Sequence, residues 1–243
     1  MNRFFVLIAY FAFVTTSSNL LADEKIRVAV TIPPIESFVS SIGGDFVEVI
    51  HLVPAGQDLH TFAPKPSKMR EMRDVDIYFK LGGIAAEKIW LDRLVDLNPS
   101  MKVMTISKGI ERIEMEGHHH HDEEGHHDEE GQSETSYDPH IWLSPSNVKK
   151  MGAQILEHLL ESMPENKVLL NKNYEKFVSE VVETDSAIKK ILSKSDRSKG
   201  FLVFHPAWGY FAKDYGLSQV SICLLYTSPS PRDYAASRMP SSA

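Results

Sequence analysis

The chain is almost without cysteine: Cys223 is the single one among 243 residues. A lone cysteine excludes a disulfide within the chain. It also lies far from the N-terminal segment, where a lipoprotein needs a cysteine at its cleavage point to carry the lipid. We therefore expect a protein that has neither an internal disulfide nor a lipid anchor.

Positive charge is not in excess either. The net charge is -7 at pH 7, because 33 acidic residues outnumber 26 basic ones. This balance gives no electrostatic reason to expect nucleic acid as a partner. The apolar content of 42% is ordinary for a soluble globular domain.

Long apolar runs are absent as well. The longest, from Phe4 to Val14, is shorter than the roughly 20 residues that span a bilayer. Arg3 precedes this run, and small and polar residues follow it up to Ala22, which is typical of a secretory signal cleaved after Ala22. We therefore expect residues 1–22 to direct export to a bacterial periplasm.

What is present first is an alternation of apolar, β-branched segments with amphipathic helical patterns. The expected strands are 26–32, 46–53, 75–82 and 102–107, and the expected helices are 33–44, 67–74 and 85–98. Such alternation predicts βαβ units and a parallel sheet, and hence an α/β fold.

The second half of the chain begins with helices. Ser144 or Ser146 is expected to cap a helix that ends near residue 162, and a longer helical pattern follows over 165–194. Its apolar residues recur at helical spacing: Val168, Leu169, Tyr174, Phe177, Val181, Val182, Ile188, Ile191 and Leu192. At 1.5 Å per residue this helix would be roughly 45 Å long. We interpret it as a spacer between two lobes.

A second α/β pattern follows the long helix. A strand is expected over 200–205, a helix over 206–216 and the start of another strand after it. Residues 223–243 are rich in Ser, Pro and Arg and show no periodicity. We interpret them as a disordered or artefactual tail.

An unusual segment lies in the middle of the chain. The stretch 117–131 reads GHHHHDEEGHHDEEG, and six of the eleven histidines fall in it: His118, His119, His120, His121, His126 and His127. The polar stretch 117–137 has no apolar periodicity, so we expect a mobile loop. Imidazole and carboxylate groups on a flexible loop are available as metal ligands.

The other five histidines fall into two groups. His51 lies within an expected strand and His158 within an expected helix, where a packed or solvated histidine is the simpler interpretation. His60 follows a strand, His140 follows Asp138-Pro139, and His205 ends a strand. Ligands of open α/β sheets bind at the carboxyl ends of strands. These three histidines therefore point to a metal site.

Neutral imidazole suits zinc, and it suits manganese or magnesium less well because those ions prefer oxygen. A site with three histidines is completed by a carboxylate, a further histidine or a water molecule. Spacing alone assigns no carboxylate to this position.

Three segments together resemble the metal-binding solute-binding proteins of ABC transporters (cluster A-I): QDLHTFAPKPSKMREMRDVDIYFKLGG, DPHIWLSP and FLVFHPAWGYFAKDYGL. The closest subgroup is the periplasmic zinc-uptake type (ZnuA-like), and the resemblance extends over 26–222. It implies two α/β lobes with parallel sheets, one long rigid linker helix and a metal site in the cleft between the lobes. It also implies an ABC permease in the membrane that receives the zinc, and we expect the chain to be a monomer.

The resemblance carries over to particular residues. His60, His140 and His205 match the first three metal ligands of the family. Manganese-type members typically have Glu at the third position, so His205 favours zinc. The fourth ligand of the family is an acidic residue downstream of position 222, and this sequence has no counterpart, since Asp233 lies in a different context.

The resemblance also implies a division of the chain, with a second lobe that is incomplete and a truncated C-terminus. The expected parts are a signal peptide (1–22), a first lobe (23–162) with the mobile loop (117–137), a linker helix (163–195), the start of a second lobe (196–222) and the tail (223–243).

The function expected from these observations is high-affinity capture of Zn²⁺ outside the cytoplasm and its delivery to a permease, without enzymatic activity. The histidine-rich loop would collect zinc for the cleft or sense saturation; alternatively it only solvates. A second hypothesis is a zinc hydrolase, because three histidines and a water also form catalytic sites, but no HExxH motif is present. A third is a metal buffer or adhesin with no role in transport.

Overall fold

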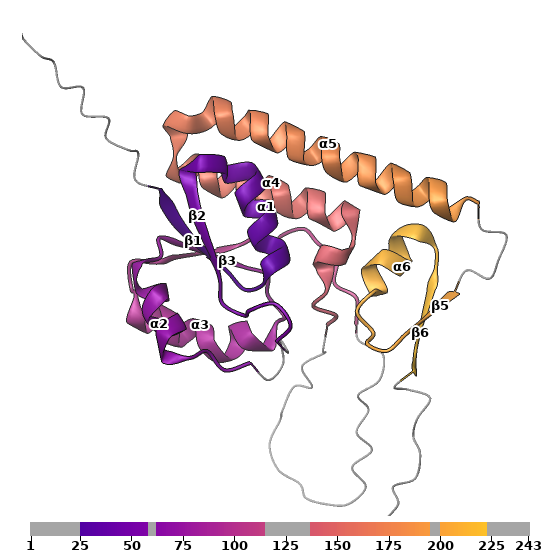
Figure 1. Ribbon diagram of the computed structural model, residues 1–243, viewed down its shortest axis with the longest axis horizontal. Coiled ribbons are helices and arrows are strands. Elements are labelled where there is room, and N and C mark those ends of the chain that lie inside the picture. The colour runs from indigo at the N-terminus through magenta and orange to yellow at the C-terminus, as the bar shows by residue number, and fades with distance from the viewer. Residues whose placement is uncertain (1–24, 58–61, 115–136, 195–199, 223–243) are drawn as a thin grey trace, which may run out of the picture.

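The computed structural model describes residues 25–57, 62–114, 137–194 and 200–222. In these residues, a larger lobe is built on a four-stranded sheet and a smaller unit on a two-stranded sheet. All neighbouring strands in both sheets are parallel. One long helix runs beside both parts (Figure 1). The expected α/β class, with parallel sheets and a long helix, is confirmed.

The first lobe follows the expected alternation of strands and helices. Its elements are β1 (Ile26–Val30), α1 (Pro33–Gly43), η1 (Gly44–Phe46), β2 (Val47–His51), α2 (Pro66–Glu71), η2 (Met72–Asp74), β3 (Ile77–Lys80), α3 (Ala85–Leu97), β4 (Lys102–Thr105), η3 (Ile141–Leu143) and α4 (Pro145–Ser162). The strand order is β2-β1-β3-β4. Because the sheet is parallel, the carboxyl ends of all four strands share one edge, where ligands of such sheets bind.

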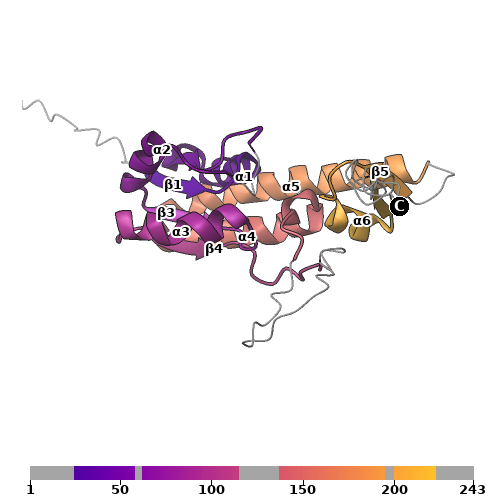
Figure 2. The same cartoon turned by 90° about the horizontal axis from the view of Figure 1, so that it is seen from below.

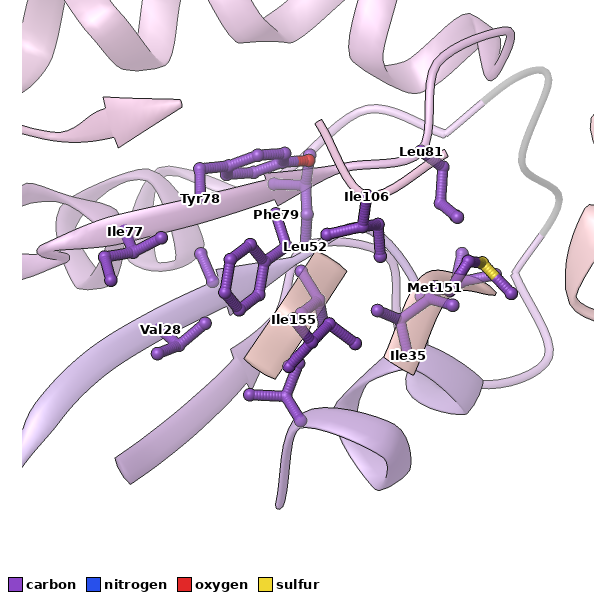
Figure 3. Packing of buried hydrophobic residues seen from close by; sticks show 14 of the residues in the cluster. Val28, Ile35, Leu52, Ile77, Tyr78, Phe79, Leu81, Ile106, Met151 and Ile155 are labelled. Carbon is purple, nitrogen blue, oxygen red and sulfur yellow. The ribbon is translucent and has the colours of Figure 1, made fainter. Parts of the chain in front are cut away.

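The core of this lobe lies on both faces of the sheet. β1 and β3 are the central strands, and their residues Val28–Val30 and Ile77–Phe79 are almost fully buried. Figure 1 shows α1, α4 and α5 on one side of the sheet and α2 and α3 on the other. Coverage of both faces explains why these strands are continuous apolar runs rather than alternating ones. Figure 3 shows Ile35 of α1 and Ile155 of α4 packing toward the strand residues.

The helix α4 begins at a side-chain cap. The Ser144 hydroxyl accepts a hydrogen bond from the backbone N–H of Asn147 at 3.2 Å, so Ser144 rather than Ser146 is the N-cap. Gly152 in the middle of α4 permits close packing of the next helix. A Cβ at this position would lie 2.5 Å from Cε1 of Phe177.

The long helix α5 (Lys167–Leu192) follows the turn η4 (Pro164–Asn166). It has 26 residues and is therefore about 39 Å long. Leu170 and Phe177 in its first half are buried against α1 and α4. Its second half extends past these helices to the smaller unit (Figure 2). The first half of α5 is thus part of the first core, and the second half bridges to the smaller unit.

Part of the apolar pattern of α5 does not mark the core. Val168 is 81% exposed and Ile191 is 69% exposed, although both fit the helical spacing. Leu170, which the pattern did not include, is fully buried. The contacts with α1 and α4 select the buried face, and the spacing of apolar residues on α5 alone does not reveal where these helices lie.

The smaller unit comprises β5 (Gly200–Val203), α6 (Gly209–Tyr215) and β6 (Ser218–Ser221). The expected helix start at Pro206 is wrong by three residues. The N–H of Ala207 donates to the carbonyl of His205 at 2.8 Å, which closes a tight turn before the helix. The expected stop at Gly216 is confirmed, since this residue has the left-handed conformation with φ of +62°.

Candidate metal centre

Two of the three candidate cleft histidines are described, and they lie together. His140 precedes η3 in the first lobe, and His205 follows β5 in the smaller unit. The two Nε2 atoms are 3.3 Å apart, and the ring centroids are 5.0 Å apart. Residues 65 positions apart in the chain thus meet where the two units adjoin.

The separation of these nitrogens suits one shared zinc ion. Two imidazole nitrogens at about 2.0–2.1 Å from a tetrahedral zinc ion lie roughly 3.3–3.4 Å from each other. The Nε2–Nε2 distance of 3.3 Å has this value. The pair therefore presents two ligand atoms at the spacing that tetrahedral coordination requires.

The carboxylate of Asp138 orients the ring of His140. Its Oδ1 lies 2.7 Å from Nδ1 of His140 and accepts the backbone N–H of His140 at 2.9 Å. Both residues are 5% exposed. A carboxylate on Nδ1 fixes the tautomer in which Nε2 carries the free lone pair, which is the form that binds metal. Nε2 of His140, the atom facing His205, is therefore the ring nitrogen whose lone pair is available to a metal ion.

The helix that follows His205 is attached to the first lobe by polar contacts. Asp214 of α6 accepts hydrogen bonds from the hydroxyls of Ser144, at 2.5 Å, and Ser146, at 2.9 Å. Lys213 forms an ion pair with Glu111 at 3.0 Å. These contacts connect the smaller unit directly to the first lobe beside the histidine pair.

The third candidate, His60, lies outside the described residues. The chain is described again from Phe62, whose carbonyl accepts a hydrogen bond from Nε1 of Trp90 at 3.1 Å. Trp90 belongs to α3, so this point of the chain is attached to the helix after β3. The histidine-rich segment 117–131 also lies outside the described residues. Among those that are described, no group of three His, Cys, Asp or Glu residues is arranged to hold a metal ion.

His51 and His158, the two histidines that we expect to be packed or solvated, contact side chains of the first lobe. Nδ1 of His51 lies 2.5 Å from a carboxylate oxygen of Glu36. The ring of His158 packs near Phe79 in the first core, with ring centroids 6.1 Å apart. Both sets of contacts lie within the first lobe, as expected of packed histidines.

A buried carboxylate lies below the carboxyl edge of the first sheet. Glu87 of α3 is 2% exposed. It accepts hydrogen bonds from the Thr31 hydroxyl and from the backbone N–H groups of Leu81, at 2.9 Å, and Gly82, at 2.6 Å. Burial raises the pKa of Glu87, and the hydrogen bonds from these donors oppose this effect without cancelling it.

This shift predicts a pH dependence of stability that Glu87→Gln removes. Because the pKa of Glu87 is higher in the folded chain than in the unfolded one, folding favours the protonated form. The contribution of Glu87 to folding stability is therefore complete below the ordinary pKa of glutamate. It is lost as the pH rises through the raised pKa of the folded chain. Urea unfolding of the metal-free native chain and of metal-free Glu87→Gln measures this effect between pH 4 and pH 8. The free energy of unfolding of the native chain should fall relative to that of Glu87→Gln as the pH rises. Parallel pH curves would contradict this account.

A separate cavity of about 460 Å³ lies between α1, α4, α5 and α6. Trp142 and Trp208, which are close in sequence to the two histidines, line it with mostly apolar neighbours. Neither His140 nor His205 lines it. Its apolar walls do not suit a metal ion, so the histidine pair and not this cavity is the candidate metal centre.

The structure adds residues that the sequence interpretation did not assign to the site. Asp138 lies two residues before a candidate ligand, and an acid at this spacing is a signal that the sequence does contain. Asp214 and its serine partners come from segments about 70 residues apart, and no pattern in the sequence pairs them.

Comparisons with known proteins agree on one family. The family described as zinc-uptake complex component A, periplasmic, matches residues 28–238. This range extends past residue 222, the expected end of the resemblance. Among the described residues, no helix is both long and apolar enough to cross a membrane, and the expected signal segment lies outside them.

Relatives and solved structures resemble this chain over most of its length. The zinc-binding lipoprotein AdcA of Streptococcus pneumoniae is 31% identical over 224 residues, which are 90% of this chain and 43% of AdcA. A ZnuA deletion mutant with zinc bound is 34% identical, with a TM-score of 0.72 over 82% of this chain and 70% of that one. The Zn(II)-bound ZnuA-like domain of AdcA is 25% identical, with a TM-score of 0.65 over 82% and 67% of the two chains. This chain spans less than half the length of AdcA.

Proposed function

The chain belongs to the family of periplasmic components of zinc-uptake complexes, and from this membership we propose that it captures Zn²⁺ outside the cytoplasm and delivers it to an ABC permease. We thus propose Zn²⁺ as the transported ion and an ABC permease as the membrane partner. Relatives named as zinc-binding, and structures named as zinc-bound, support the choice of ion.

The observation that carries the proposal is the separation of the two Nε2 atoms. His140 and His205 come from different units, and their 3.3 Å separation suits a shared tetrahedral zinc ion. Binding by both histidines would couple zinc capture to the way the two units adjoin. That coupling would let a permease distinguish a loaded chain from an empty one.

His60 is the proposed third ligand. The chain is attached to α3 two residues later, at Phe62, by the hydrogen bond from Trp90. We assign no residue to the fourth position, which a carboxylate, a further histidine or a water molecule would fill. Zinc accepts any of these groups in sites with three protein nitrogens.

The histidine-rich segment is proposed as an auxiliary zinc-collecting site. Its histidines are His118, His119, His120, His121, His126 and His127, with acidic residues between them. A segment that loses conformational freedom on binding binds less tightly than a preformed site. The segment would therefore hold zinc weakly and raise its concentration near the cleft pair.

We also propose the division and location expected from the sequence. The first lobe is 23–162, the linker 163–195 and the second lobe begins at 196, after export directed by residues 1–22. The family description places such components in the periplasm. The relative AdcA is named a lipoprotein, whereas this sequence has no cysteine near Ala22. Mass spectrometry of the exported chain would distinguish a free N-terminus at Asp23 from a lipid-modified one.

A binding protein and a hydrolase differ in one direct assay. The zinc-loaded chain should bind and release zinc without turning over ester, amide or phosphate substrates. Family membership favours this outcome over the three-histidine hydrolase. Zinc-dependent turnover that disappears in His140→Ala would overturn the transport proposal.

Transport itself is tested in cells. Zinc uptake at scarce external zinc should fall when the gene for this protein is deleted, and should return when the native gene is restored. A gene encoding His140→Ala should not restore it. Restoration by this variant, expressed and exported at the native level, would contradict delivery through the cleft site and would favour the buffer or adhesin alternative.

Zinc affinity should depend steeply on pH. Zinc binds neutral imidazole, so protons compete with the ion for the same nitrogen atoms. We expect the affinity to fall by about tenfold or more between pH 7 and pH 5.5, and to fall steeply as the pH drops through about 6. A titration against a competing chelator of known pH dependence measures this change. An affinity that does not change between pH 7 and pH 5.5 would contradict histidine ligation.

A further inference from the structure

Tyr210 contacts the described residues on either side of 115–136, a range that we call the inserted segment. It is the second residue of α6, five positions after His205, and it is 3% exposed. Its hydroxyl donates a hydrogen bond to the carbonyl of Asp138 at 2.9 Å and accepts one from the backbone N–H of Ile113 at 3.2 Å. Burial is the main cause that raises the pKa of Tyr210, so the hydroxyl keeps its proton at neutral pH.

The two partners of this hydroxyl belong to a short stem. We define the stem as residues 113–114 and 137–138, the described residues on either side of 115–136. The N–H of Asp138 donates to the carbonyl of Ile113 at 2.8 Å, and Glu114 and Tyr137 form an antiparallel bridge. The Tyr210 hydroxyl joins both sides of the stem to α6. The stem is therefore fastened to the unit that carries His205.

The stem also contains the residue that orients His140. Asp138 accepts from Nδ1 of His140 through its side chain and from Tyr210 through its backbone carbonyl. A continuous series of hydrogen bonds thus runs from the first histidine through Asp138 to Tyr210, on the helix after the second histidine. These hydrogen bonds join protein groups only, so they can orient His140 relative to the helix that follows His205 before zinc binds.

Gly209 allows α6 to approach this closely. A Cβ at Gly209 would lie 2.8 Å from Oδ2 of Asp138, well inside contact distance. The absence of a side chain therefore brings the start of α6 against the carboxylate that orients His140. Gly209 thus permits the close approach of α6 to the stem, and Tyr210 supplies the hydrogen bonds between them.

We propose that Tyr210 and Asp138 are positioning residues, which set the separation of the His140 and His205 nitrogens and fasten the stem of the inserted segment to the second unit. The proposal rests on the proposed zinc-binding function and concerns which groups pre-arrange its ligands. Neither residue contacts the metal in this account. Partners that hold ligating histidines typically change metal affinity by about 10–100-fold when they are replaced.

A matched control is available on the same helix. The hydroxyl of Tyr215 donates to Asp185 of α5 at 2.8 Å. This bond also attaches α6 to the rest of the chain, but it contacts neither the stem nor a candidate ligand. Tyr215→Phe therefore removes the same chemical group from the same helix without disturbing the series of hydrogen bonds to His140.

The experiment compares Tyr210→Phe, Asp138→Asn and Tyr215→Phe with the native chain. Zinc affinity, measured against a competing chelator, should fall about tenfold in Tyr210→Phe and about 10–100-fold in Asp138→Asn. It should stay within about twofold in Tyr215→Phe, where no ligand is repositioned. The absorption bands of bound Co²⁺ report ligand geometry and should change in the first two variants only.

The outcomes separate this proposal from the function on which it rests. Failure of the native chain to bind zinc tightly would overturn the proposed function, and this inference with it. Tight native binding, with equal affinity and equal Co²⁺ bands in Tyr210→Phe and Tyr215→Phe, would overturn the positioning role alone. Circular dichroism of the metal-free variants checks that each is folded.

A second variant is decisive if Tyr210→Phe does not fold. Gly209→Ala keeps every hydrogen-bonding group and introduces only the Cβ that would lie 2.8 Å from Asp138 Oδ2. We expect it to weaken zinc binding about tenfold by displacing the carboxylate that orients His140. A folded Gly209→Ala variant with native affinity and native Co²⁺ bands would overturn the proposal.

Discussion

Alanine at either His140 or His205 should weaken zinc binding by about 100-fold or more. Zinc sites with four protein ligands have binding free energies of about 10–16 kcal/mol, so one ligand accounts for roughly 3 kcal/mol, or about two orders of magnitude. The two Nε2 atoms are 3.3 Å apart and are expected to share one ion, so loss of either nitrogen removes half of the described pair. His60→Ala should have a similar effect if it supplies the third ligand. Titration against a competing chelator measures each loss.

Histidines of the inserted segment provide the control for this prediction. His119→Ala and His126→Ala change the same side chain outside the proposed cleft site. Each should leave the tight binding event within about twofold, because neither imidazole belongs to the proposed cleft site. Equal losses in the cleft variants and in these controls would contradict a distinct cleft site.

Deletion of 117–131 should abolish the weak zinc-binding events and keep the tight one. The segment contains six of the eleven histidines, whereas the proposed cleft ligands lie outside it. The stem at residues 113–114 and 137–138 is retained in this deletion, so the contacts of Tyr210 are preserved. Cells that produce the deleted chain should take up less zinc when zinc is scarce and as much as native cells when it is plentiful.

A length-matched variant separates the imidazoles from the segment itself. Replacing the six histidines of 118–127 with glutamine keeps the glycines, the acidic residues and the number of residues. It should reproduce the uptake defect of the deletion if imidazole groups collect the zinc. Native uptake at scarce zinc in both variants would contradict the auxiliary role and leave the segment as a solvating loop.

The sequence predicted much of the fold because local patterns determine much of it. Apolar β-branched runs mark the strands β1 to β4. Ser144 begins α4 through its side-chain cap, and Gly216 ends α6 through its left-handed conformation. The strand order β2-β1-β3-β4 was not predicted, because the pairing of strands depends on contacts between distant segments. The exposed Val168 and Ile191 show the same limit for the buried face of α5.

The candidate site was predicted in part for the same reason. His205 ends an expected strand and His140 follows Asp138-Pro139, and the structure brings these two candidate ligands together. Their separation, and the hydrogen bonds of Asp138 and Tyr210 that hold them, depend on how α6 approaches the first lobe. A close approach that Gly209 permits is visible only when Asp138 is placed beside it.

The measurement that tests the central claim most directly is zinc titration calorimetry of the chain that lacks 117–131, with a competing chelator present. His140→Ala in the same background is the control. We predict one tight event with one zinc ion per chain, which the His140→Ala change removes. Absence of a tight event, or a tight event unchanged by His140→Ala, would contradict a zinc site built on the His140–His205 pair.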